Sequence, residues 1–366
     1  MPSSTARVHS LDALRGLLAI GIMAYHLLGW TRVASFTTLG TYGVYAFFAL
    51  SGFALEWAYG RRLHEPGGIR RYGAARVGRI LPLYAGAALA TAAMTLYAGG
   101  HFDRSDLLLN VSLTFGFFNP GATSTVVGGW SIGIEVVFYA LFPIIAWLRL
   151  ETRWLILLAS AALALRIVYV DGLLLPGTSL ASAWVAYSQM PSFLWFFLAG
   201  MVGARFVAAR DDRLGTVVAN GGLRASWPFA AAVGLMGLVV AAPLLGDQRA
   251  MFVWPIGAVL AITVAFAVVL AGHAPPWHGR PAQIATLLGD VSYGIYLLHP
   301  IVWRAAYLAH VGGRTALIVT FMVTPLLALV VHRLIEVPAR GAIRSTLGPR
   351  PSPARIVPVP PPQKPA

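Results

Sequence analysis

The first apolar stretch of the sequence, LDALRGLLAIGIMAYHLLGW, carries two ionisable side chains that a membrane segment normally avoids. Ten residues separate Arg15 from His26, so at about 100° per helical residue both lie on one helix face, about 16 Å apart. Each ionisable group inside a span costs roughly 2.5 to 3.5 kcal/mol on insertion scales and needs a reason. A guanidinium binds anions, and an imidazole accepts protons near neutral pH. Taken alone, His26 is also compatible with a simple polar contact between helices.

Two later apolar segments hold further ionisable groups. Glu135 lies in GGWSIGIEVVFYALFP, close to Trp130 and Tyr139, and His299 lies in LGDVSYGIYLLHP. Counted from the predicted cytoplasmic ends, His26, Glu135 and His299 lie about 18 to 20 Å deep. This agreement predicts one shared polar cavity, with separate local pairing for packing as the alternative.

Two arginines open the third predicted span in RVGRILPLY. Arg76 and Arg79 are three residues apart, so they share a helix face and can bind a phosphate together. Arginines at a cytoplasmic boundary are also ordinary topology signals. The pair is therefore compatible with either role.

The elements that must position these residues are membrane helices. The chain has 366 residues, of which 58% are hydrophobic and 11% charged, whereas soluble domains are about 45 to 50% apolar. Many apolar stretches reach the roughly 18 residues needed to cross a bilayer. The sequence predicts an all-α integral membrane protein with about ten transmembrane helices, at 13–30, 40–59, 78–98, 126–148, 154–170, 189–209, 227–245, 251–271, 286–308 and 315–337.

The basic residues are distributed unequally between the two sides of the predicted membrane domain. The formal net charge is +14, and most basic residues lie in alternate loops or at the termini, which places both termini in the cytoplasm. The scattered arginines form no nucleic-acid motif, so nucleic acid is not an expected partner. The predicted inner basic residues are Arg7, Arg61, Arg62, Arg70, Arg71, Arg149, Arg153, Arg210, Arg213, Arg224, Arg280, Arg340, Arg344, Arg350, Arg355 and Lys364, and the outer ones are Arg32, Arg104, Arg249 and Arg314.

Two domains are expected. Residues 1–337 form the membrane domain and residues 338–366 a disordered cytoplasmic tail rich in arginine and proline, with no extra soluble domain. The outer segment 99–125 either folds back on the bundle or forms a plain surface loop. The first apolar stretch lacks a cleavage site and is expected to remain as a span. The chain contains no cysteine, which excludes disulfides and thiolate chemistry.

Six short motifs resemble, in order, those of the membrane-bound acyltransferase 3 family. The match runs from residue 10 to residue 340, and although each motif is weak, six in order are specific. They are SLDALRGLLAIGIMAYH with its R-x10-H spacing, FFALSGF, the R-x-x-R of Arg76 and Arg79, WSIGIEVVFY, in which Ile132 and Gly133 vary the family pattern, VSYGIYLLHP, and IEVPAR.

The resemblance implies an enzyme of the bacterial inner membrane. Members transfer an acyl group, usually acetyl, from cytoplasmic acyl-CoA to a hydroxyl of a carbohydrate or related acceptor, such as a surface polysaccharide, a glycolipid or another metabolite. The expected partners are therefore acyl-CoA as co-substrate, such an acceptor and the lipid bilayer, with no metal. A transporter or flippase for a lipid-linked glycan is the alternative, since a polar cavity within ten spans would suit it too, but we find no internal repeats.

The residues can be assigned roles in this chemistry. Arg15, Arg76 and Arg79 would bind the phosphates of CoA at the inner mouth. His26 would act as general base or accept the acyl group itself, and the sequence leaves both open. Glu135 would orient the histidine or bind acceptor hydroxyls. Weaker candidates for the substrate cavity are Ser51, Trp130, Tyr139 and His299.

Overall fold

The structure is a computed structural model that describes residues 7–174, 177–214, 227–247 and 249–347. Within these ranges every regular element is a helix. The longer helices are α1 (His9–Trp30), α2 (Thr37–Tyr59), α3 (Gly68–Tyr97), α6 (Gly129–Trp147), α7 (Thr152–Arg166), α9 (Leu194–Leu214), α10 (Trp227–Ala241), α11 (Ile256–Gly272), α12 (Gly279–Leu308), α13 (Gly313–Val331) and α14 (Val337–Leu347).

Shorter helical turns connect them. Three are α-helical: α4 (Arg104–Val111), α5 (Pro120–Thr123) and α8 (Trp184–Tyr187). The 3₁₀ turns are η1 (Arg62–His64), η2 (Thr114–Phe117), η4 (Met190–Ser192), η6 (Ala242–Leu245) and η7 (Arg249–Met251), and the π-helical turns are η3 (Ile167–Leu174) and η8 (His332–Glu336).

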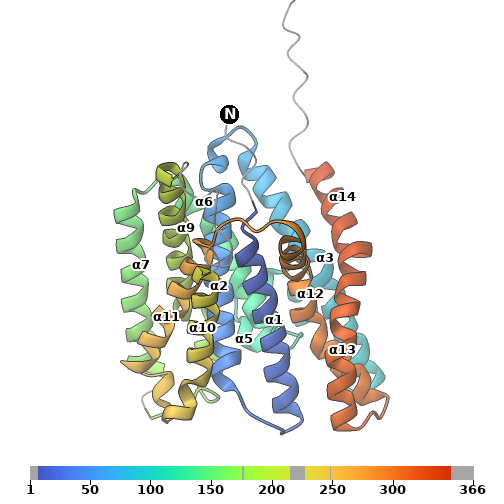
Figure 1. Ribbon diagram of the computed structural model, residues 1–366. Coiled ribbons are helices and arrows are strands. Elements are labelled where there is room, and N and C mark those ends of the chain that lie inside the picture. Colours follow the sequence, from blue (N-terminus) through green and yellow to red (C-terminus); the bar gives the residue numbers. More distant parts are fainter. Residues whose placement is uncertain (1–6, 175–176, 215–226, 248, 348–366) are drawn as a thin grey trace, which may run out of the picture.

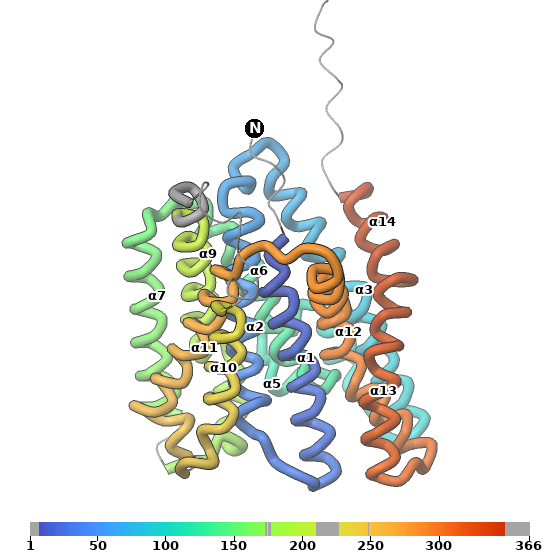
Figure 2. Tube along the Cα trace, in the orientation of Figure 1, coloured from blue at the N-terminus to red at the C-terminus, as the bar shows by residue number. Residues whose placement is uncertain are grey.

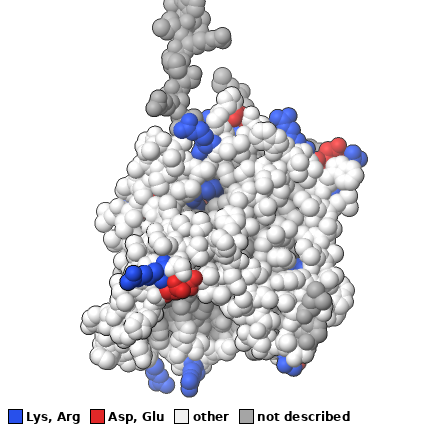
Figure 3. All heavy atoms as spheres, turned by 180° about the vertical axis from the view of Figure 1, so that it is seen from behind, with Lys and Arg blue, Asp and Glu red and all other residues white. Residues whose placement is uncertain are grey.

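The structure confirms the prediction of an all-α membrane protein. Among the described residues, seven helical segments are long and apolar enough to cross a membrane, and Leu194–Ala209 and Ile256–Gly272 are apolar but shorter. α12 has 30 residues and completes the set of ten helices that overlap the ten expected spans, although the number that cross remains a prediction. Most of the face seen in Figure 3 carries neither basic nor acidic atoms, as a surface in contact with lipid requires.

The helices form one bundle with α1 at its centre (Figures 1 and 2). α2, α7, α9, α10 and α11 lie on one side of α1, and α3, α12, α13 and α14 lie on the other. α1 packs extensively against α12, and α2 against α9. Helices from opposite ends of the sequence therefore meet at the centre of the bundle.

Two glycines allow α2 and α9 to approach closely. A Cβ added at Gly52 would lie 1.9 Å from the carbonyl oxygen of Phe197, and one added at Gly200 would lie 1.9 Å from that of Ala49. Small residues at such contacts are typical of membrane helix pairs. The motif FFALSGF therefore contains a packing residue, Gly52, beside Ser51.

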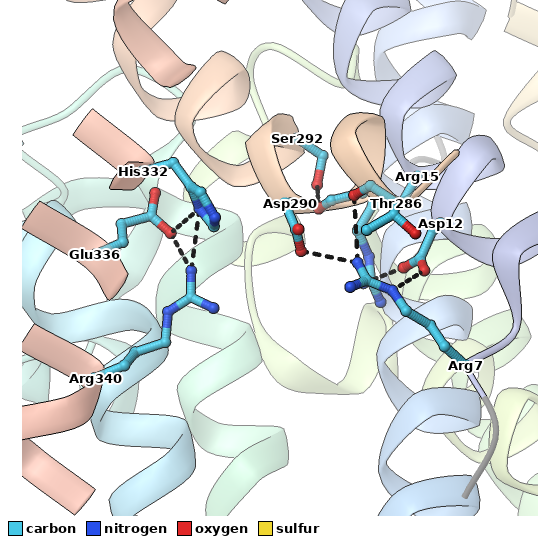
Figure 4. Close-up of polar contacts among 10 residues, drawn as sticks. Arg7, Asp12, Arg15, Thr286, Asp290, Ser292, His332, Glu336 and Arg340 are labelled. Atoms are coloured by element: carbon cyan, nitrogen blue, oxygen red, sulfur yellow. Dashed lines mark hydrogen bonds and ion pairs between the residues drawn. The ribbon is translucent and has the colours of Figure 1, made fainter. Parts of the chain in front are cut away.

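An ion-pair cluster joins the start of α1 to α12 (Figure 4). Arg7 donates to the carboxylate of Asp12, with 2.5 Å between Nε and Oδ2, and to Asp290, with 2.8 Å between Nη2 and Oδ1. Asp12 also lies 3.9 Å from the guanidinium of Arg15. The cluster fixes the end of α1 at which Arg15 enters the bundle.

The segment 99–125 folds back against the bundle. Asn110 of α4 is fully buried and accepts a hydrogen bond from the hydroxyl of Tyr84 at 2.8 Å. Phe115 is also fully buried and stacks on Tyr84. Of the two expectations for this segment, the packed one is therefore correct.

The region expected to be a disordered tail begins with a helix. Residues 338–347 belong to α14, which packs along α3. The side chains of His332, Glu336 and Arg340 are linked by hydrogen bonds where α13 passes into α14 (Figure 4), with 2.5 Å between Arg340 Nη2 and Glu336 Oε2. The expectation of disorder was wrong for this part, because these residues continue the helix of α13 through the π-helical turn η8 and pack along α3. Residues 348–366, with Arg350, Arg355 and Lys364, lie outside the described residues, as does Arg224.

Candidate active site

Two histidines from helices at opposite ends of the sequence meet inside the bundle. His26 of α1 and His299 of α12 are 2.8 Å apart between Nδ1 and Nε2, although 273 positions separate them in the chain. The two rings are stacked, with 5.0 Å between centroids. His299 is 1% exposed. The long contact between α1 and α12 brings the two imidazoles together.

The hydrogen bonds define which nitrogen of His26 is available. His299 Nδ1 lies 3.1 Å from the carbonyl oxygen of Ile295, and because a carbonyl only accepts, this nitrogen donates. In neutral His299 the other nitrogen, Nε2, is then an acceptor, and His26 Nδ1 donates to it. The remaining nitrogen of neutral His26, Nε2, therefore carries a lone pair that can accept a proton.

An indole ring holds His26 in place. Trp30, one helical turn after His26, stacks on its imidazole with 5.2 Å between centroids and 4° between planes. It also stacks on His299 at 6.0 Å. The sequence interpretation missed Trp30, which the i, i+4 spacing from His26 could have indicated.

The cavity on the side of Arg15 is cationic and polar. It is lined by groups from α1, α2, α3, α6 and α12, and its lining includes most of the residues proposed from the sequence. Ser131, Glu135 and Tyr139 reach it together because the i, i+4, i+8 spacing places them on one face of α6. We call it the inner cavity, and its predicted residues are Arg15, Ser51, Arg76, Arg79, Glu135 and Tyr139.

Glu135 does not pair with His26. Its carboxylate accepts hydrogen bonds from the hydroxyls of Ser51 and Tyr139, the latter at 2.6 Å. Glu135 lines the inner cavity, whereas His26 borders a second one. The prediction of one cavity shared by His26, Glu135 and His299 was therefore wrong, because similar depth does not place residues on facing helix surfaces.

The side chain of Arg76 is positioned by two aromatic rings and keeps an unpaired donor. Its guanidinium lies over the rings of Tyr59 and Tyr139, 5.4 and 5.5 Å from their centroids. Its Nε is buried and has no hydrogen-bond partner in the described part of the chain. An unsatisfied buried donor in a cavity that also holds Arg15 and Arg79 fits an anionic ligand.

The second cavity, which we call the outer cavity, lies toward the end of the bundle opposite residue 7. His26 borders it, and so do Trp130 of α6 and Trp184 of α8, which form an edge-to-face pair with 5.0 Å between centroids. The sequence interpretation named Trp130 but missed Trp184, whose segment gave no signal of chemistry.

Tyr296 and Val44 line both cavities and so form the wall between them. The hydroxyl of Tyr296 lies 2.9 Å from the carbonyl oxygen of Gly128 and 2.8 Å from the hydroxyl of Ser131. Gly128 has φ of 77° and would place a Cβ 2.9 Å from that tyrosine hydroxyl, so a glycine is required there. The wall is thus fixed by hydrogen bonds between α12 and the start of α6.

No group of three or more histidine, aspartate or glutamate side chains within the described ranges is arranged to hold a metal ion. The polar groups that line the two cavities or pair beside them are imidazoles, arginines, hydroxyls and the carboxylate of Glu135. A multi-pass helical bundle that holds a histidine pair beside adjoining cationic and aromatic cavities defines a membrane-embedded protein with an interior site for polar ligands.

Comparison with known proteins identifies the family. The model of the family described as an acyltransferase domain matches residues 8–337, and the chain belongs to this family. No solved structure matches it.

Three relatives illustrate the range of the similarity. Acyltransferase MdmB of Streptomyces mycarofaciens is 27% identical over 340 residues, which cover 83% of this chain and 81% of that protein. Exopolysaccharide production protein ExoZ of Rhizobium meliloti is 26% identical over 326 residues, which cover 84% of this chain and 92% of that protein. O-acetyltransferase OatA of Staphylococcus aureus is 23% identical over 90% of this chain but only 57% of its own length.

Proposed function

We propose that the protein transfers an acyl group, acetyl in the first instance, from cytoplasmic acyl-CoA to a hydroxyl of a carbohydrate or related acceptor at the bacterial inner membrane. The observation that carries this proposal is the contact of His26 with His299 at the outer cavity, which adjoins the inner cavity at Val44 and Tyr296. The names of the relatives, which include an acyltransferase, an O-acetyltransferase and an exopolysaccharide production protein, support it.

The inner cavity is assigned to the donor. Arg15, Arg76 and Arg79 would bind the phosphates of CoA, whose thioester arm would extend along the cavity toward Tyr296. Arginine suits this task because its planar fork donates two parallel hydrogen bonds to a phosphate. Glu135 would keep Ser51 and Tyr139 oriented along the cavity wall rather than orient His26.

The outer cavity is assigned to the acceptor. Nε2 of His26 would take the proton of the acceptor hydroxyl while its oxygen attacks the thioester carbon. The new bond is the ester C–O bond, the broken bond is the C–S bond, and the proton passes from His26 to the departing thiolate. His299 would hold the ring of His26 and stabilise the charge that develops on it, as an orienting partner does in a catalytic triad.

The test uses the purified protein with radiolabelled acetyl-CoA and extracted acceptor glycans. His26→Ala should lower acetyl transfer by about 10² to 10⁴-fold, the typical contribution of a general base. His101→Ala is the matched control, because His101 is exposed and lies outside both cavities.

The possible outcomes separate the alternatives. Full transfer by His26→Ala would remove His26 from the mechanism. Label that stays on the protein after rapid denaturation in detergent at neutral pH, and is absent in His26→Ala, would favour an acyl-histidine intermediate over the general base. An acetyl-CoA pool left intact by the wild-type protein with every acceptor would favour the transporter alternative.

A further inference from the structure

The outer cavity combines aromatic faces with hydroxyl groups. Its volume is about 340 Å³, which falls in the range of roughly 300 to 1,000 Å³ typical of sites for small molecules. Trp130 and Trp184 present an edge-to-face indole pair. The hydroxyl-bearing residues of the lining are Tyr25, Thr37, Thr41, Tyr45, Ser124, Tyr187 and Tyr296.

No charged side chain lines this cavity among the described residues. The contrast with the inner cavity and its three arginines is sharp, although both lie in the same bundle. Behind the lining lies a buried cation, Arg166, whose Nη2 donates to the hydroxyl of Tyr45 at 3.3 Å. Arg166 is only 1% exposed and lies 3.9 Å from the carboxylate of Asp171, so its charge is offset before it reaches the cavity.

These features select for one kind of ligand. Flat indole faces match the C–H faces of a pyranose ring, and hydroxyls exchange hydrogen bonds with sugar hydroxyls. A carboxylate or phosphate on the ligand would lose its hydration with no opposite charge to replace it, which is strongly unfavourable. Tyr45, Tyr187 and Ser124 already bond within the protein, but an acceptor of mainly hydrocarbon character would cover the hydroxyls of Tyr25 and Thr41 without offering them a hydrogen bond.

We propose that the outer cavity binds an uncharged sugar residue, stacked on Trp130 or Trp184, with its acceptor hydroxyl at Nε2 of His26. The cavity thereby discriminates against uronic acids and sugar phosphates. This proposal rests on the proposed acyl transfer and names the chemical class of its acceptor.

The first experiment compares sugars that have the same hydroxyl groups but differ in charge at C6. Purified protein is given radiolabelled acetyl-CoA with matched p-nitrophenyl glycosides: the uncharged glucuronamide against the glucuronide, and the uncharged galacturonamide against the galacturonide. The uncharged member of a pair should be acetylated with kcat/KM at least about tenfold higher, a difference of about 1.4 kcal/mol in transition-state binding. Equal or faster acetylation of the charged member would overturn the proposal.

Two other outcomes are informative. Acetylation of an apolar alcohol such as dodecanol, with none of the sugars modified, would overturn the sugar assignment and leave acyl transfer standing. No acetylation or consumption of acetyl-CoA with any acceptor would count against both the site and the proposed function.

The second experiment tests the aromatic wall. Trp184→Leu and Trp130→Leu should each raise the acceptor KM by about tenfold or more and leave the KM for acetyl-CoA within twofold of wild type, since the donor enters the other cavity. Trp147→Leu is the matched control, because Trp147 is 68% exposed at the other end of α6. An unchanged acceptor KM in both cavity variants would overturn the site.

A third variant predicts a gain of activity with one substrate, which a loss of protein stability could not produce. Thr41→Arg places a cation in the lining, and it should raise the rate of acetylation of the glucuronide relative to that of the uncharged glucuronamide by about tenfold. A ratio equal to that of the wild-type protein would contradict the claim that the uncharged lining sets the discrimination.

Discussion

His299 differs from His26 in having both ring nitrogens engaged. One donates to the carbonyl of Ile295 and the other meets His26. A side chain bound in this way cannot itself take a proton from an acceptor without breaking a buried hydrogen bond. His299 is therefore a positioning residue, and its effect on catalysis should pass through the orientation of His26.

This assignment predicts the kinetics of two substitutions. His299→Ala should lower kcat by about 10²-fold, because His26 loses the partner that fixes its tautomer, and leave the KM for acetyl-CoA unchanged. His299→Gln, which keeps one acceptor near His26, should recover part of the activity. Steady-state kinetics with acetyl-CoA measures both.

The control for this pair is His273→Ala. His273 also bonds a carbonyl one helical turn earlier, with 2.8 Å between its Nδ1 and Val269, but lines neither cavity. It should keep wild-type kcat. Equal losses in the two alanine variants would indicate a general effect of removing a histidine that bonds a helix carbonyl.

Sequence reasoning placed residues on helices better than it found the residues that they contact. The spacing of Arg15 and His26 follows from the helix repeat alone, and both lie on α1 as expected. The partner of His26 could not be found in this way, because helical periodicity fixes a face but not the helix that the face contacts. Glu135 was matched to His26 by depth, and the structure pairs it with Ser51 and Tyr139 instead.

At the scale of elements, the contact between α2 and α9 sets the position of Ser51. Gly52, the next residue, meets the backbone of Phe197 with no room for a side chain. Backbone cannot move aside as the end of a flexible side chain can, so a larger residue must push the helices apart.

Gly52→Ala should therefore destabilise the protein by about 1 to 3 kcal/mol, the usual cost of overpacking. It should also displace Ser51 from Glu135 and lower acetyl transfer. Thermal unfolding in detergent measures the first effect. Gly86→Ala on α3 is the control, because a Cβ there has open space around it, and its Tm should match or exceed that of the wild type. A wild-type Tm for Gly52→Ala would show that α2 and α9 are not in close contact.

The ten helices were predictable because each apolar stretch is long enough to be seen in the sequence. Which helices pack together was not predictable, since α1 packs against α12, a helix near the other end of the sequence. α14 was missed for a different reason, because a segment that contains Pro338 and several arginines reads as a tail. Its packing along α3 depends on Gly78, whose added Cβ would lie 3.3 Å from the Cα of Arg340.

At the scale of the whole molecule, the charge distribution predicts the orientation of the bundle. Basic loops gather at the end where residue 7 and α14 lie, so this end should face the cytoplasm. The same orientation opens the inner cavity toward the compartment that supplies acyl-CoA. The proposed mechanism therefore fails as a whole if the orientation is reversed.

The absence of cysteine from the sequence allows a direct test of this orientation. Ser35→Cys lies between α1 and α2, and Ser345→Cys lies near the end of α14, where Leu347 accepts a hydrogen bond from Arg70. Both serines are exposed, at opposite ends of the bundle, and both changes are conservative. In spheroplasts a membrane-impermeant maleimide should label Ser35→Cys at once and Ser345→Cys only after permeabilisation. Labelling of Ser345→Cys in intact spheroplasts would place the arginines of the inner cavity on the side without acyl-CoA, and the donor would then need another route to His26.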